Sequence, residues 1–200
     1  MTRRKVAANR NRERILLAAR ALLLSQDFSE FSMETVARQA GVSRLTLYYQ
    51  FKSKAGLLEA LNDFIARRGE MGELAEAFRA GDPIRTLHEF IRVLAGFWDS
   101  DRELIRRLRA VGSLDSEVGR SLAERNERRR HGCRVIIERY YHWYPMLPEP
   151  WASRAVDTLQ MLTSFETFDT LAVSGRKFDE VVQILHKQAY AVINYTPPSI

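Results

Sequence analysis

The chain has 200 residues, of which 46% are hydrophobic, so it can bury one large core or two smaller ones. Its single cysteine, Cys133, excludes an internal disulfide, and no apolar stretch is long enough to span a bilayer. The basic start at residues 1–5 lacks the apolar run that a secretory signal needs. We therefore expect a cytoplasmic protein with no membrane segment.

The net charge of +6 is concentrated at one end of the chain. Residues 1–60 contain 11 Lys and Arg against 5 Asp and Glu, whereas residues 61–200 contain 20 of each. A concentrated basic region binds a phosphate backbone through Coulomb attraction and counterion release, which favours a nucleic-acid partner. A merely solvated basic N-terminus gives the same count, so charge alone leaves both interpretations open.

Apolar residues recur at three- and four-residue spacing along nearly the whole chain, and strand-like alternation is absent. This periodicity predicts an all-α fold. The first four predicted helices span residues 10–25, 33–40, 44–50 and 54–68, with a break at residues 26–29 after the first. Ser32, Ser43 and Ser53 stand directly before the second, third and fourth helices, where their side chains can cap free N–H groups.

Glycines and prolines divide the rest of the chain. Asp82-Pro83 is a strong helix start, because aspartate can cap and proline fits the first helical position. The helices predicted from there on span residues 83 to at least 98, 101–110, 116–144, 151–173 and 178–195. Gly112-Ser113 is expected to interrupt the chain before the long helix, and Pro145, Pro148 and Pro150 are expected to form a loop after it.

Residues 32–51 meet the requirements of a helix-turn-helix. Gly41 can adopt the positive φ needed to turn sharply, and Ala37 is small where two helices would cross. The predicted inward face consists of Val36, Ala40, Val42, Leu47 and Phe51. The predicted outward face consists of Ser43, Arg44, Leu45, Thr46, Tyr48, Tyr49 and Lys52. A helix of this size fits the major groove of DNA, and an ordinary helical hairpin with a glycine turn is the alternative.

The stretch GVSRLTLYYQFKSKAGLL from Gly41 to Leu58, with the preceding FSMETVARQA, resembles the signature of TetR-type (TetR/AcrR) transcriptional regulators. This resemblance implies a helix-turn-helix DNA-binding domain over residues 10–68. The basic residues Arg3, Arg4 and Lys5 indicate a flexible basic arm at residues 1–9, which either enters the minor groove or is only a solvated tail. The resemblance also implies a C-terminal ligand-binding and dimerisation domain over residues 69–200. The expected protein is a homodimeric repressor, released from a palindromic double-stranded DNA operator by a small-molecule effector.

The resemblance assigns a role to each matching residue. Phosphate contacts fall to Thr35, Lys52 and Lys54, and contacts with bases or nearby phosphates fall to Arg44 and Thr46. Tyr48 and Tyr49 are expected to contact the backbone and thymine methyl groups. The full DNA-binding set is Thr35, Ser43, Arg44, Leu45, Thr46, Tyr48, Tyr49, Lys52 and Lys54. The guanidinium fork of Arg44 suits guanine, and Leu45 and Gln50 depart from the residues frequent in the family.

The C-terminal half offers candidates for an apolar pocket with a few polar groups, which is the usual composition of a small-molecule site. They are Phe97, Trp98, Cys133, Tyr140, Tyr141, Met161, Phe165 and Phe168. The expected effector is a small hydrophobic or aromatic molecule, and the last two helices are expected to form the dimer. In the alternative, these side chains are ordinary core and the C-terminal domain binds another protein instead of an effector.

Sequence patterns for other kinds of site are absent. The four histidines are scattered, and His131 and Cys133 are two residues apart and so point to different sides of a helix. We therefore expect no metal site and no cofactor. There is no nucleophile elbow, glycine-rich phosphate loop or pair of catalytic carboxylates, so an enzyme is not expected.

Overall fold

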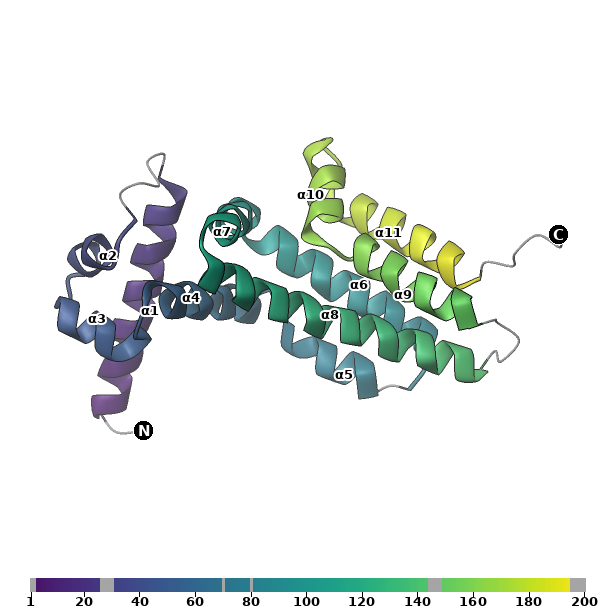
Figure 1. The fold of residues 1–200 in the computed structure, drawn as a ribbon, viewed down its shortest axis with the longest axis horizontal. Coiled ribbons are helices and arrows are strands. Elements are labelled where there is room, and N and C mark those ends of the chain that lie inside the picture. The colour runs from purple at the N-terminus through teal and green to yellow at the C-terminus, as the bar shows by residue number, and fades with distance from the viewer. Residues whose placement is uncertain (1–2, 26–30, 70, 80, 144–148, 195–200) are drawn as a thin grey trace. The chain divides into compact units, whose positions relative to one another are not determined.

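The computed structural model describes residues 3–25, 31–69, 71–79, 81–143 and 149–194 (Figure 1). Within these ranges all regular elements are helices, which confirms the predicted all-α fold. None of the helices in the same ranges combines the length and the apolar composition needed to cross a membrane. The predicted break at residues 26–29, the predicted loop at Pro145 and Pro148, and the predicted helix ends Tyr144 and Tyr195 lie outside the described residues.

The helices group into two compact units, and each unit draws on two segments of the chain. The first unit combines Met1–Ala66 with Asp101–Ala123, and the second combines Arg67–Ser100 with Glu124–Ile200. Packing therefore returns a later segment to the N-terminal unit. The functional boundary expected between residues 68 and 69 stays a prediction.

The first unit carries the predicted helix-turn-helix. It contains α1 (Arg3–Leu24), α2 (Met33–Gln39), α3 (Arg44–Phe51), α4 (Lys54–Arg68) except its last two residues, α7 (Arg102–Leu114) and the start of α8 (Ser116–Trp143). α1 packs against α2 and α7, and α2 packs against α3. Its core is built from side chains that are almost fully buried, namely Ile15, Leu16, Leu23, Leu47, Leu57, Leu58 and Leu61. Burial of such aliphatic side chains is the main force that holds these short helices together.

α1 begins at Arg3, not at the predicted Arg10, so the expectation of a flexible arm at residues 1–9 is wrong from Arg3 onward. The segment from residue 3 to residue 10 contains no glycine or proline, and its Arg, Lys and Ala residues have high helix propensity. Once the later turns of α1 are anchored on the core, each added residue gains a hydrogen bond without a new nucleation step. Basic charge alone therefore did not distinguish an arm from a helix.

The second unit contains η2 (Met71–Glu73), α5 (Leu74–Arg79), α6 (Pro83–Ser100), the rest of α8, α9 (Glu149–Leu162), α10 (Phe165–Val173) and α11 (Phe178–Ile193). α11 packs against α6 and α9, and α10 packs against α6 (Figure 1). The predicted start of α6 is confirmed, because Asp82 Oδ1 accepts hydrogen bonds from the N–H groups of Ile84 and Arg85.

The predicted interruption at Gly112-Ser113 is wrong, since α7 runs through both residues to Leu114. A Cβ added at Gly112 would lie 2.6 Å from Leu122 Cδ1, and one added at Gly119 would lie 2.5 Å from the carbonyl oxygen of Gly112. These glycines allow α7 and α8 to approach closely where they cross. A helix tolerates glycine when close packing offsets its entropic cost.

The single helix predicted over residues 151–173 is also wrong, because the chain breaks between α9 and α10 at Thr163. Ser164 caps α10 by accepting a hydrogen bond from the N–H of Thr167 at 3.2 Å. The Thr163 side chain is buried and donates to the carbonyl of Leu159, while the Thr163 carbonyl accepts from Trp98 Nε1 at 3.0 Å. The break thus exposes a backbone carbonyl to an indole N–H from α6, which helical periodicity does not reveal.

Candidate nucleic-acid interface

The two helices of the helix-turn-helix begin with the same local structure. The Oγ atoms of Ser32 and Ser43 each accept a hydrogen bond at 3.1 Å from the backbone N–H three residues ahead, at Thr35 and Thr46 respectively. The paired hydroxyls are also bonded, at 2.7 Å between Ser32 and Thr35 and at 2.8 Å between Ser43 and Thr46. The predicted caps are confirmed, and they place hydroxyl groups at both helix N-termini, where an anion is favoured.

The turn between α2 and α3 forms as the sequence predicts. Gly41 has φ +61°, and the N–H of Val42 donates to the carbonyl of Ala37 at 3.0 Å. Of the predicted inward residues, Val36, Ala40, Leu47 and Phe51 are buried, and Val42 is half-buried. The glycine therefore supplies the left-handed residue that ends α2, and the apolar face of α3 locks the pair of helices together.

The opposite face of α3 is exposed and carries apolar as well as polar side chains. Leu45 is 80% exposed and Tyr49 is 79% exposed, which is unusual for such large hydrophobic groups. Ser43 and Arg44 are also exposed, and Thr46 is half-buried. Because no partner within the first unit covers Leu45 and Tyr49, this face has the composition of a surface that is buried only in a complex.

Two cations lie over tyrosine rings on the same face. Arg44 Cζ lies 5.5 Å from the centroid of Tyr48, and Lys52 Nζ lies 5.3 Å from that of Tyr49. The pKa of Arg44 is raised, first by its interaction with Tyr48 and then by the charge of Glu34. The rings thus hold two of the predicted phosphate- and base-contacting groups close to the helix before any ligand arrives.

The junction between α3 and α4 is backbone-strained at Lys52. This residue has φ +66° and ψ −51°, and the N–H of Ser53 donates to the carbonyl of Phe51 at 2.7 Å, which closes a γ-turn around it. A Cβ at Gly56 would lie 2.2 Å from the carbonyl oxygen of Phe51, so only glycine lets α4 start this close to α3. Ser53 caps α4 through the N–H of Gly56, as predicted.

This turn sets the positions of the two predicted phosphate-binding lysines. Lys52 is exposed at the turn, and Lys54 is the first residue of α4, with its Nζ 5.5 Å from the ring centroid of Phe31. Lysine is a point charge that attracts phosphate without a fixed geometry. Seven of the nine predicted DNA-binding residues thus lie on α2, α3 or the start of α4, and the other two, Ser43 and Lys52, are the caps of α3. Their contacts with DNA stay predictions.

Sequence reasoning missed two arginines of α1 that contact the helix-turn-helix. Arg14 Nη2 donates to the carbonyl of Gly41 at 3.4 Å, and Arg12 Cζ lies 4.6 Å from the ring centroid of Phe51. Both contacts join residues that are far apart in the sequence, so the periodicity of α1 could only indicate that these side chains lie off its apolar stripe. Arg14 thus holds the turn against α1, and Arg12 holds the end of α3 against it.

The candidate pocket residues of the second unit fall into separate groups. The rings of Phe97 and Trp98 have centroids 4.6 Å apart, and those of Trp98 and Phe165 are 5.7 Å apart. Phe168 is buried as well. By contrast, Met161 is 58% exposed and does not line an interior. The structure therefore brings three of the candidate rings into one cluster and leaves Met161 on the surface.

The candidate polar residues differ in the same way. Tyr140 is buried, and its hydroxyl is hydrogen-bonded to Asn194 Oδ1 at 2.9 Å. Cys133 is fully buried, and burial raises the pKa of its thiol to about 11, against the opposing effect of Arg129. Tyr141 instead lines a surface depression of about 340 Å³ between α8 and α9, beside Arg130 and Arg134.

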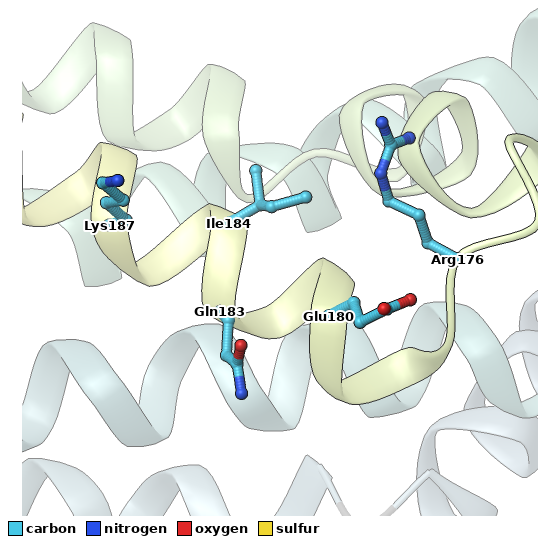
Figure 2. A pocket seen from close by; sticks show the side chains of 5 residues that line it. All are labelled: Arg176, Glu180, Gln183, Ile184 and Lys187. Atoms are coloured by element: carbon cyan, nitrogen blue, oxygen red, sulfur yellow. The ribbon is translucent and has the colours of Figure 1, made fainter.

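A second depression, of about 310 Å³, lies along α11. Figure 2 shows Glu180, Gln183, Ile184 and Lys187 along this helix, with Arg176 from the segment before it. Its lining is mainly charged, which differs from the apolar composition expected for the predicted effector. In the part of the chain that the structure describes, no group of three or more His, Cys, Asp or Glu side chains is placed to hold a metal ion.

Residues 15–61 match the family described as bacterial regulatory proteins, tetR family. The chain is 35% identical over 80 residues to the HTH-type transcriptional regulator EthR of Mycolicibacterium smegmatis, which covers 40% of this chain and 37% of EthR. It is 32% identical over 90 residues to the HTH-type transcriptional regulator AcrR of Shigella flexneri, which covers 44% of this chain and 41% of AcrR. The matches thus span less than half the length of these curated relatives.

Solved structures resemble the chain over nearly its whole length. A protein described as a TetR-family transcriptional regulator from Syntrophomonas wolfei has a TM-score of 0.76 and 14% identity, over 96% of this chain and 99% of that chain. NalD, the secondary repressor of the MexAB-OprM multidrug efflux pump in Pseudomonas aeruginosa, has a TM-score of 0.70 and 22% identity, over 93% and 96%. At these identities the likeness concerns the fold, and the relatives are regulators, not enzymes. Residues 15–61 of this chain are thus similar to the tetR family of bacterial regulatory proteins.

Proposed function

We propose that this chain is a sequence-specific DNA-binding transcriptional regulator that places α3 in the major groove. The observation that carries the proposal is the outward face of α3, where Leu45 and Tyr49 are about four-fifths exposed beside Arg44 and Lys52. Arginine reads guanine edges, and apolar side chains contact the thymine methyl group. The distribution of charge along the chain supports the proposal as well, since the excess of Lys and Arg over Asp and Glu falls in residues 1–60.

The proposed regulator acts as a homodimer on a palindromic operator. Two copies of α3 then occupy major grooves about one helical turn, ~34 Å, or a multiple of it apart. The last helices supply the proposed dimer surface, since Met161, Val173 and Tyr190 are large apolar side chains more than half exposed there. Isologous pairing of such helices from two subunits builds a four-helix bundle.

The proposed regulator is a repressor that a small hydrophobic or aromatic effector releases from DNA. The aromatic cluster around Trp98 in the second unit is the region proposed to receive that effector. Such an effector binds more tightly to one of two conformations of the protein than to the other. This difference in binding free energy, typically ~1–3 kcal/mol, is the amount by which the effector can weaken DNA binding.

A second candidate keeps DNA binding but replaces the effector by a protein partner. The observation that favours it is the same cluster, because Phe97, Trp98 and Phe165 pack on one another and Trp98 already has its hydrogen-bond acceptor. A thermal-shift screen against hydrophobic small molecules separates the two candidates. Stabilisation that coincides with release from DNA supports the effector, and the absence of any stabilising compound supports the protein partner.

DNA reading is tested by selection from a duplex library with 20 randomised base pairs. The wild-type chain is expected to enrich an inverted repeat, and Leu45→Ala is expected to shift the enriched sequence. Leu114→Ala is the matched control, because Leu114 is an equally exposed leucine of the same unit that lies on α7 instead of α3. If the wild-type chain enriches no sequence, it does not read DNA as proposed.

A further inference from the structure

Glu34 is the only acidic residue between Phe31 and Gly56. This segment contains α2, the turn, α3 and the start of α4, and its basic residues are Arg38, Arg44, Lys52 and Lys54. A carboxylate close to the phosphate backbone weakens binding to DNA of any sequence. Glu34, as a single acid in this basic segment, is therefore expected to lower DNA affinity, and a gain other than affinity must account for it.

The structure places this acid beside the candidate base-reading arginine. Glu34 lies in the first turn of α2, and its Oε2 is 4.0 Å from Nη1 of Arg44, the first residue of α3. A preference of acids for helix N-termini accounts for Glu34 on α2, but not for its closeness to a guanidinium of the next helix. Tyr48 is the other neighbour, with its ring centroid 5.5 Å from Arg44 Cζ.

The contact is too exposed to matter much for folding. The side chains of Arg44 and Glu34 are 65% and 75% exposed, and ion pairs of this kind contribute little to stability. Their interaction strengthens when DNA covers the surface, because charges attract and repel more strongly once water is excluded. The pair therefore acts mainly in the complex, where the carboxylate repels any phosphate that approaches the guanidinium.

We propose that Glu34 is a specificity-determining residue, which keeps Arg44 from settling on phosphates and leaves it to base edges. This inference rests on the proposed DNA-binding function. Guanine offers two acceptors, O6 and N7, to one guanidinium, and so competes with the carboxylate better than a single phosphate oxygen does. Glu34 thus lowers affinity for all DNA and raises discrimination at the base pair that Arg44 reads. A residue that only stabilised α2 would leave that discrimination unchanged.

The test compares Glu34→Gln with Glu13→Gln, which removes the same charge from an exposed position on α1. The probes are the duplex most enriched by the wild-type chain, its single-base-pair variants, and a duplex of unrelated sequence. The base pair read by Arg44 is the one whose preference Arg44→Ala loses. Glu34→Gln is expected to bind the unrelated duplex about threefold more tightly at low salt, and to lose about fivefold in discrimination at that base pair. Glu13→Gln keeps the wild-type discrimination.

One further measurement and one further variant make the outcome decisive. At the other base pairs of the enriched duplex, Glu34→Gln is expected to keep the wild-type discrimination, because the carboxylate acts through Arg44 alone. Glu34→Asp keeps the charge but shortens its reach, so discrimination falls without a gain in affinity for unrelated DNA. Wild-type discrimination by Glu34→Gln at the base pair that Arg44 reads, or an equal loss at every base pair of the duplex, overturns the inference. A wild-type chain that enriches no duplex overturns the proposed function instead.

Discussion

Replacement of Lys52 tests whether the γ-turn after α3 is strained. Lys52 has φ +66°, and a non-glycine residue in such a region costs about 1–3 kcal/mol. Lys52→Ala keeps a Cβ and hence the strain, whereas Lys52→Gly removes both. Glycine also loses about 0.5–1 kcal/mol of entropy on folding relative to alanine, so Lys52→Gly is expected to be more stable than Lys52→Ala by about 1 kcal/mol.

The assay is thermal unfolding followed by circular dichroism, with Lys54→Gly and Lys54→Ala as the matched pair. Lys54 is the first residue of α4 and has an ordinary negative φ. At this position the alanine variant should therefore melt at a higher temperature than the glycine variant, the reverse of the order at Lys52. Both Lys52 variants lose an ammonium group, and the slope of log affinity against log salt should fall by about 0.9 per lost phosphate contact. A Lys52→Ala variant that melts at or above Lys52→Gly would refute the strain.

Two more predictions concern the packing of each unit. Gly119→Ala should lower the melting temperature, by an overpacking cost of about 1–3 kcal/mol, because its Cβ would lie 2.5 Å from the Gly112 carbonyl oxygen. Gly96→Ala, within α6, should instead raise the melting temperature, because an added Cβ there meets open space. A change of melting temperature in the same direction for both variants would contradict the close crossing of α7 and α8. Burial lowers the pKa of His186, so the unfolded state binds more protons just below the ordinary pKa of 6.5. The stability that neutral His186 contributes is therefore fully present above pH 6.5 and falls as the pH drops towards the lowered pKa. His186→Gln should flatten this pH dependence of the melting temperature between pH 5 and 7.5. His142→Gln, which replaces an exposed histidine, should preserve it.

Sequence reasoning succeeded where the determinant is local. Ser32, Ser43 and Asp82 cap helices because their side chains reach N–H groups two or three residues ahead, and this reach depends only on neighbouring residues. The same holds for the turn at Gly41, where one backbone conformation decides the geometry. The helix-turn-helix and its outward face could therefore be predicted almost residue by residue.

It failed where a distant partner decides the structure. Gly112 carries the usual signal of a helix break, yet Gly119 and Leu122 on the next helix make it a close crossing. The break at Thr163 depends in the same way on Trp98, 65 residues earlier. The contact between Glu34 and Arg44 joins two helices whose separate patterns give no reason for it. A helical face shows which side chains are inward, but not whether they enclose a space or fill it.

The state of Cys133 has a practical consequence for experiments on this chain. With no solvent exposure and a pKa of about 11, only about one thiol in 10⁴ is ionised at pH 7, so maleimide reagents react with it very slowly. A cysteine introduced at an exposed position on α3 or α11 can carry a fluorophore while the native one stays in place. The rate at which Cys133 itself is slowly labelled then reports how often the interior around it opens to water.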